Sequence, residues 1–339
     1  MLKFAINKVI SYENLTESEM IRAMNGIMDG QATESQIGSF LTGLRMKGET
    51  LEEITGSAKV IRNKALSINI KDDYAIDTCG TGGDGANTFN ISTISAFIGA
   101  AAGVKVIKHG NRSVSSQCGS ADVLESLGVN IHLNPIEVQK CVEELKIGFM
   151  FAPNFHRAMK YAIGPRRELG IRTIFNVLGP LTNPAKVKGQ VLGVFNEELT
   201  ELMSQVLREL GTERAMVVHG LDGLDEITIT NRTKVSELKD NKIVNYYIDP
   251  REYGLPLAKT KELIGGEPKQ NAEIILNILK GEKGPRRNMV LLNAGAAIYV
   301  GKKVESLEEG IDKAMEVIDR GIALKKLNQL VKLSQEMRK

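Results

Sequence analysis

Residues 77–93 read DTCGTGGDGANTFNIST, and this stretch decides the fold. The largely apolar segments 74–76 and 94–100 flank it, which predicts a strand, a glycine-rich turn and the start of a helix. Glycines let such a turn adopt positive φ and let a ligand approach its backbone; here they are Gly80, Gly82, Gly83 and Gly85. Successive N–H groups in the turn and at the helix N-terminus favour a bound phosphate.

The same run has a plainer interpretation, which is that it only turns the chain. It fits neither the G-x-G-x-x-G nor the P-loop pattern, so no standard nucleotide-binding fingerprint identifies it. Asn90, Ser92 and Thr93 would add polar side chains where the helix begins. Cys79 has no histidine near it in the sequence to activate its thiol, so a catalytic nucleophile is disfavoured there.

Size and composition are those of an ordinary globular protein. The chain has 339 residues, 42% of them hydrophobic and 25% charged, which favours two domains or one large domain with a satellite. A net charge of +3 without a long basic tract disfavours nucleic-acid binding. We expect a cytoplasmic protein, because no apolar run approaches the ~18 residues of a membrane span and no signal peptide is visible. The three cysteines lack C-x-x-C spacing, which disfavours a zinc site and a disulfide framework.

Residues 1–70 predict a small helical domain. Three capping boxes each open a segment with helical spacing, at Thr16-x-x-Glu19, Thr33-x-x-Gln36 and Thr50-x-x-Glu53. Gly30 and Gly48 stand where C-terminal glycines would end the first two of these segments.

The rest of the chain has the α/β pattern of short apolar strands alternating with helices. We assign residues 71–164 and 189–339 to this domain and interpret 165–188, which is rich in proline, as a crossing back to the helical domain. The expected strands are 104–107, 129–131, 146–151, 190–194 and 215–218, and the expected C-terminal helices are about 271–280, 286–298 and 305–336.

Polar loops follow three of the expected strands, at 77–93, 108–120 and 219–226. Ligands of open α/β sheets bind beyond the carboxyl ends of the strands, so convergence of these loops would make a site. Lys108 and several hydroxyls in the second loop suit a phosphate, although a solvated turn is an alternative. His109 has the side chain of a general acid or base, but nothing in the sequence fixes its pKa.

Asp225 and Glu226 are adjacent carboxylates in the third loop. Carboxylates beside a phosphate suit Mg²⁺, whereas the absence of neighbouring His or Cys argues against zinc; a solvated acidic turn is the alternative. Arg166, beside a proline in the crossing segment, has the side chain to hold a substrate carboxylate in bidentate fashion, and so has Arg167 next to it.

Together these motifs resemble the anthranilate phosphoribosyltransferase family, and the resemblance covers nearly the whole chain. Its residues are 77–84, Asn90-Ile91-Ser92-Thr93, Lys108-His109-Gly110-Asn111-Arg112-Ser113, 119–122, 172–184, Asp225-Glu226 and 291–294. The resemblance implies a small all-helical domain plus a large α/β domain of the nucleoside phosphorylase/phosphoribosyltransferase type. It also implies a homodimer that forms through the helical domain.

The activity implied by the resemblance belongs to tryptophan biosynthesis. The phosphoribosyl group of phosphoribosyl pyrophosphate passes to the amine of anthranilate, giving N-(5-phosphoribosyl)anthranilate and pyrophosphate. Because the aromatic amine is already a usable nucleophile, we expect neither a covalent intermediate nor an essential general base.

The resemblance also implies the site residues. The catalytic residues would be Ser92, Lys108, Asp225 and Glu226, and two Mg²⁺ per subunit would bind Ser92, Asp225 and Glu226. The phosphoribosyl pyrophosphate site would comprise Gly80, Gly83, Asp84, Thr88, Asn90, Ile91, Ser92, Thr93, Lys108, His109, Gly110, Asn111, Arg112, Ser113, Val114, Ser115, Ser116 and Ser120. Anthranilate would contact Gly80, His109, Asn111, His156, Arg166, Gly179 and Pro180. One departure from the family is Arg157, which stands where a proline is expected and affects the expected shape of the anthranilate entrance.

Two other functions compete with this one. A pyrimidine nucleoside phosphorylase of the same fold is disfavoured by the pair Asp225-Glu226 and by the sequence KHGNRS at residues 108–113. A non-catalytic relative that binds single-stranded nucleic acid would need a basic groove with stacking aromatics, whereas this chain has no Trp and 5% aromatic residues.

Overall fold

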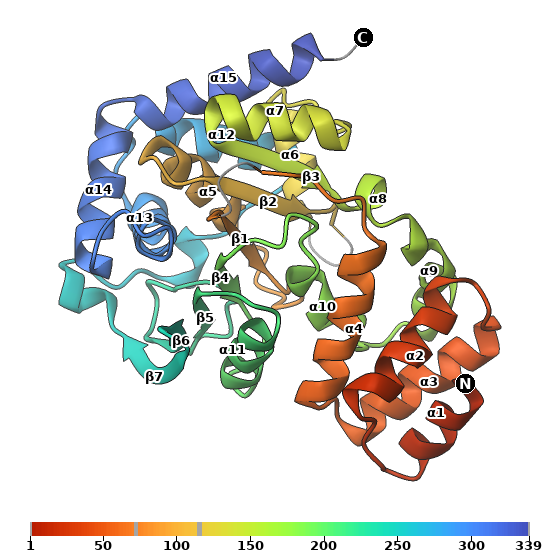
Figure 1. Ribbon diagram of the computed structural model, residues 1–339. Coiled ribbons are helices and arrows are strands. Elements are labelled where there is room, and N and C mark those ends of the chain that lie inside the picture. Colours follow the sequence, from red (N-terminus) through yellow and green to blue (C-terminus); the bar gives the residue numbers. More distant parts are fainter. Residues whose placement is uncertain (1, 71–73, 114–116, 338–339) are drawn as a thin grey trace.

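The computed structural model describes residues 2–70, 74–113 and 117–337, and shows a helical bundle beside a larger α/β unit (Figure 1). The bundle begins with four helices: α1 (Leu2–Ile10), α2 (Glu17–Met28), α3 (Glu34–Lys47) and α4 (Leu51–Lys64). All three predicted capping boxes form, because the side chains of Thr16, Thr33 and Thr50 each accept the N–H three residues on. Gly30 and Gly48 follow α2 and α3 with φ of 71° and 88°, as their predicted stop positions require.

The crossing segment completes the bundle. After α8 (Ala152–Phe155) and a short 3₁₀ turn (Arg157–Met159) come α9 (Lys160–Leu169) and α10 (Phe175–Leu181). Helix α9 packs against α2 and α3, and α10 packs against α4. Ile174, Phe175 and Leu178 are buried in the same apolar core as the bundle helices.

The α/β unit is built on a seven-stranded sheet in the order β3-β2-β1-β4-β5-β6-β7. The strands are β1 (Ile76–Gly80), β2 (Val106–Gly110), β3 (Ile147–Phe151), β4 (Gly189–Gly193), β5 (Arg214–Gly220), β6 (Thr233–Lys239) and β7 (Lys242–Ile248). The first five are parallel, and β6 and β7 extend the β5 edge antiparallel. The strand order therefore reverses between β1 and β4, which is where open α/β sheets bind ligands.

Helices cover both faces of this sheet. On one face lie α5 (Ile91–Ala101), α13 (Pro285–Val300), α14 (Leu307–Asp319) and α15 (Ile322–Glu336), and on the other lie α11 (Leu199–Glu209) and the bundle (Figure 1). Alternation along β5 divides the two cores, since Met216 and Val218 join the α5 side and Val217 joins the α11 side. The remaining helices are α6 (Ser120–Ser126), α7 (Pro135–Leu145) and α12 (Pro268–Leu279), and the remaining 3₁₀ turns are η2 (Pro250–Tyr253) and η3 (Thr260–Glu262).

Two details of the predicted pattern were wrong. Residues 129–131 form no strand: β3 is already the sheet edge, and the N–H of Asn130 is bound by Ser334 Oγ at 3.0 Å instead of by a neighbouring strand. The expected helix 305–336 is two helices, α14 and α15, because Gly321 adopts a φ of 68° between them. Neither error moves a strand end that carries the predicted loops.

Candidate active site

The three predicted loops meet at the β1/β4 reversal. The N–H of Gly82, after β1, donates to Asp225 Oδ2 at 2.7 Å, and the N–H of Ser92, on the first turn of α5, donates to Glu226 Oε1 at 3.1 Å. Lys108, on β2, places its Nζ 3.2 Å from Ser92 Oγ. Residues from β1, β2, α5 and the loop after β5 therefore share one small volume.

Glycines in the first loop serve two different needs. Gly82, Gly83 and Gly85 have φ of 67°, 78° and 74°, which is the conformation that glycine favours. Gly80 instead provides space, because a Cβ there would collide with the carboxylate of Asp225. Gly193, at the end of β4, does the same for the backbone of Asp225, and the sequence pattern did not single it out.

The start of α5 carries the predicted polar residues. Ile91 is its first residue and is buried, and Thr93 is buried with no hydrogen-bond partner for Oγ1 among the described residues. Asn90 is the N-cap residue, but its amide donates to the carbonyl of Cys118 at 3.1 Å and accepts from Asn271 at 3.0 Å. Thr88 forms an isolated bridge with Ile264.

Lys108 is a buried cation fixed at the anion-binding turn. Its side chain is 4% exposed and donates to the carbonyl of Thr78 as well as to Ser92 Oγ. The nearby carboxylate of Asp77 accepts from Asn183 at 2.8 Å; burial raises the pKa of Asp77, and the charge of Lys108 opposes this rise. A lysine held in this way is a preorganised positive charge at the N-terminus of α5.

Asp225 and Glu226 form a partly buried acidic pair. Burial is the main cause that raises the pKa of both, and negative neighbours add to it, Asp84 for Asp225 and Asp225 for Glu226. No group of three or more His, Cys, Asp or Glu side chains within residues 2–70, 74–113 and 117–337 forms a complete metal cage. Excess negative charge with few protein ligands fits Mg²⁺, which keeps waters and takes substrate phosphates.

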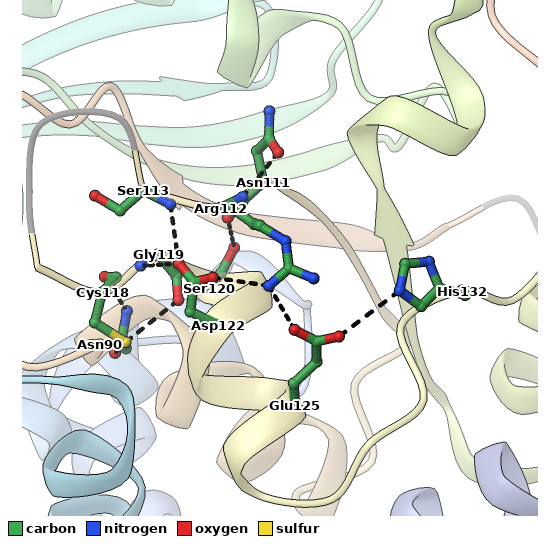
Figure 2. Close-up of polar contacts among 10 residues, drawn as sticks. All are labelled: Asn90, Asn111, Arg112, Ser113, Cys118, Gly119, Ser120, Asp122, Glu125 and His132. Carbon is green, nitrogen blue, oxygen red and sulfur yellow. Dashed lines mark hydrogen bonds and ion pairs between the residues drawn. The ribbon is translucent and has the colours of Figure 1, made fainter.

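Acidic side chains of α6 hold the loop that follows β2 through hydrogen bonds and ion pairs (Figure 2). Asp122 on α6 accepts the N–H groups of Ser113 at 3.0 Å and Gly119 at 2.9 Å, and it pairs with Arg112 at 3.0 Å. Arg112 also pairs with Glu125, so its guanidinium is already engaged by carboxylates. Of the predicted phosphoribosyl pyrophosphate residues, Gly110 ends β2, Ser120 begins α6, and Val114, Ser115 and Ser116 lie outside the described residues.

A second part of the site lies between β2 and α10. The rings of His109 and His156 meet edge to face with centroids 4.9 Å apart, and the backbone of Gly179 lies near the His109 ring. Burial lowers the pKa of His109 well below its usual value and that of His156 to about 4, so both rings are neutral near pH 7. Gly179 and Pro180 are on α10, and a Cβ at Gly179 would meet open space.

The two neighbouring arginines, Arg166 and Arg167, lie in different environments. Arg166 is half-buried, and its guanidinium lies 4.9 Å from the centre of the Phe175 ring and makes no hydrogen bond or ion pair with any described residue. Arg167 is exposed, and so is Arg157, the residue that departs from the family pattern. An arginine with unused donors beside the site is the better candidate for an anionic ligand.

Arg172 belongs to the motif 172–184, and the sequence alone assigned it no role. It donates to the carbonyl of Gly83 and stacks 4.2 Å from the ring of Phe195, which ties the crossing segment to the glycine-rich loop. The position of Arg172 is set by the path of the crossing segment 165–188 in the folded protein, and no local sequence pattern predicts that path. At Cys79, by contrast, burial raises the pKa of the thiol well above its usual value, which disfavours a thiolate nucleophile there.

Comparison with known proteins now decides the family. Residues 3–65 match the helical bundle domain of the glycosyl transferase family, and residues 72–324 match its a/b domain. An anthranilate phosphoribosyltransferase of Alkaliphilus metalliredigens is 69% identical over 338 residues, covering 100% of both chains. That of Acetivibrio thermocellus is 62% identical, covering 98% of this chain and 97% of the relative. The chain belongs to the anthranilate phosphoribosyltransferase family.

Solved structures agree with this family. The anthranilate phosphoribosyltransferase of Thermus thermophilus has a TM-score of 0.93 at 41% identity, covering 98% of this chain and 99% of that one. The Saccharomyces cerevisiae enzyme in complex with phosphoribosyl pyrophosphate and magnesium has a TM-score of 0.91 at 28% identity, covering 99% and 98%. The predicted fold class is confirmed, and the full-length match favours the transferase over the phosphorylase and nucleic-acid-binding alternatives.

The buried histidines predict a pH-dependent stability. The folded pKa of His156, about 4, lies below its unfolded value of about 6.5. The unfolded chain therefore takes up the proton first, and stability is lost as pH falls from about 6.5 towards 4. Replacing His156 with Asn should make this loss smaller by up to about 3 kcal/mol, measured by urea unfolding at each pH. Parallel pH profiles for the two proteins would contradict the prediction.

Proposed function

We propose that this chain transfers the phosphoribosyl group of phosphoribosyl pyrophosphate to the amine of anthranilate, in tryptophan biosynthesis. The observation that carries the proposal is the meeting of the glycine-rich turn, Lys108 and the pair Asp225-Glu226 at the N-terminus of α5. Phosphate needs the N–H groups and the lysine, and the carboxylates need a divalent cation that pyrophosphate also binds. The names of the full-length relatives supply the acceptor.

The phosphate groups would lie along the first two loops. We assign to this site the predicted residues of the turn, of the start of α5 and of the loop after β2: Gly80, Gly83, Asp84, Thr88, Asn90, Ile91, Ser92, Thr93, Lys108, His109, Gly110, Asn111, Arg112, Ser113, Val114, Ser115, Ser116 and Ser120. Ser92, Asp225 and Glu226 would hold Mg²⁺, with two ions per subunit as our proposal. Magnesium, when bound, acts as a Lewis acid and template for the departing pyrophosphate. The yeast relative was solved with magnesium and phosphoribosyl pyrophosphate, which supports this assignment.

Anthranilate would enter beside the crossing segment. Arg166 would bind its carboxylate, and Gly80, His109, Asn111, His156, Gly179 and Pro180 would line its path. A complex of the yeast relative with 4-fluoroanthranilate supports an aromatic acceptor in this fold. Two neutral histidine rings suit an aromatic ligand, because neither adds a charge that would need solvation.

The chain's own residues then favour bond cleavage at C1 of the ribose. Negative charge develops on the leaving pyrophosphate, and Lys108, Ser92 and the N–H groups of the turn are preorganised to stabilise it. Holding the amine of anthranilate in line supplies the remaining acceleration by proximity. The amine loses one proton after the N–C1 bond forms, and water or the departing pyrophosphate can accept it, so the scheme requires no protein base. The low pKa of His109 would make it a poor base.

Assembly and location follow the family. We propose a homodimer through the helical domain, where large apolar side chains are exposed on α1 and α3: Phe4, Ile10 and Met46. Tyr161 and Ile163 are exposed on α9, which packs against α2 and α3. We keep residues 1–70 with 165–188 as the helical domain and 71–164 with 189–339 as the catalytic domain, in a cytoplasmic protein. Among the residues described, no helix has the length and apolar character of a membrane span.

The activity is tested by following the fluorescence of anthranilate. We expect it to fall when the protein, phosphoribosyl pyrophosphate and Mg²⁺ are all present, and to stay constant when any one of the three is omitted. Constant fluorescence in the complete mixture would contradict the proposal, and phosphate-dependent release of thymine from thymidine would favour the phosphorylase instead.

The arginine assignment is tested by a matched pair of variants. Arg166→Ala should raise the KM for anthranilate by about 10- to 100-fold, because charge-assisted hydrogen bonds contribute about 1.5–3 kcal/mol, and should leave the KM for phosphoribosyl pyrophosphate nearly unchanged. Arg167→Ala, one residue away and exposed, is the control and should behave as the parent protein does. Equal effects of the two variants would refute the assignment.

A further inference from the structure

Asn293 on α13 makes an unusually complete set of hydrogen bonds. Its side chain is 2% exposed, accepts the N–H of Ile227 at 3.0 Å, and donates to the carbonyls of Ile227 at 2.8 Å and Met289 at 2.9 Å. Both backbone groups of Ile227 are thus bound by one side chain from a helix distant in sequence. A buried amide that satisfies both backbone groups of a residue fixes its position and orientation.

The residue held in this way directly follows the acidic pair. Glu226 precedes Ile227, and its carboxylate reaches the N–H of Ser92 at the start of α5. Helix α5 packs against α13, the helix that carries Asn293. The distance between the Glu226 carboxylate and the anion-binding turn therefore depends on a contact outside the site.

The other side of the acidic loop has its own anchor. Asp222 Oδ2 accepts the hydroxyls of Thr228, at 2.6 Å, and Thr230, while its Oδ1 accepts the N–H of Leu224 at 3.3 Å. Gly220 N–H also donates to the carbonyl of Leu224 at 2.8 Å. The segment 222–228 is consequently closed on itself, and Asn293 joins it to the helical layer over the sheet.

We infer that Asn293 is a positioning residue that sets the affinity of the acidic pair for its divalent cation. The inference rests on the proposed function, because the cation is the one assigned above to Asp225 and Glu226. Asn293 fixes the backbone of Ile227, and this places the Glu226 carboxylate 3.1 Å from the N–H of Ser92; a loop without that anchor would relax so that the two carboxylates separate. Holding them in place before the cation arrives removes that cost from binding.

The test uses Mn²⁺ as the probe and measures binding without turnover. Water-proton relaxation enhancement reports Mn²⁺ on the protein in the presence of phosphoribosyl pyrophosphate and the absence of anthranilate. Asn293→Leu removes all three hydrogen bonds and keeps a similar shape, so we expect about tenfold weaker Mn²⁺ binding. The Mg²⁺ concentration for half-maximal rate should rise equally, while kcat at saturating Mg²⁺ and the KM for anthranilate should stay within about twofold of the parent.

Leu292→Ala is the matched control on the same helix. Leu292 is fully buried and its apolar side chain makes no hydrogen bond to the acidic loop, so its truncation should lower the Tm without weakening Mn²⁺ binding. If Asn293→Leu does not fold, Asn293→Ser, whose side chain is too short to bind both groups of Ile227, takes its place with the same expectation.

Four outcomes separate the possibilities. Unchanged Mn²⁺ affinity in a folded Asn293 variant would overturn the inference, and so would equal weakening in Leu292→Ala, which would make the effect one of general stability. Failure of the parent protein to bind Mn²⁺ would overturn the metal assignment itself, and with it that part of the proposed function. Weakening confined to the Asn293 variants supports the inference.

Discussion

The site depends on one electrostatic constraint, which is that two partly buried carboxylates lie against the N–H groups of a glycine-rich turn. Asp225 and Glu226 accept hydrogen bonds from Gly82 and Ser92, groups that a phosphate would also use. Burial is the main cause that raises the pKa of both carboxyl groups, and the charge of Lys108 opposes this rise only at Glu226. A divalent cation would offset the negative charge of the two carboxylates and would attract the pyrophosphate to the same N–H groups.

The fold produces this constraint through close backbone approach. The loop after β5 crosses the carboxyl ends of β4 and β1, and it fits there because Gly193 and Gly80 have no Cβ. The reversal of strand order at β1 and β4 sends α5 to one face and α11 to the other, which leaves the crevice that the loop enters. Helix α10 then brings the backbone of Gly179 near His109 from the helical side, so the two proposed substrate sites would adjoin.

Sequence predicted the features that are local. Capping boxes at Thr16, Thr33 and Thr50 name their own partners three residues on, and strand ends followed by polar loops indicated where the site forms. It did not give the contacts that tertiary structure creates. Asn293 bonds to Ile227 across 66 residues of sequence, and Arg172 bonds to Gly83 across 89. No periodicity in the sequence predicts either contact. The false strand at 129–131 has the same origin, since apolar residues at a sheet edge look alike whether or not a neighbour pairs with them.

The most direct test of the electrostatic account is calorimetric binding of phosphoribosyl pyrophosphate with Mg²⁺ and with EDTA, without anthranilate. The parent protein should bind at least about tenfold more tightly with Mg²⁺. In the double variant Asp225→Asn/Glu226→Gln the order should change: it should bind more tightly than the parent protein in EDTA, because the repulsion is gone, and more weakly in Mg²⁺. If the variant binds more weakly than the parent protein under both conditions, the acidic pair is not the charge that the cation offsets, and the account is contradicted.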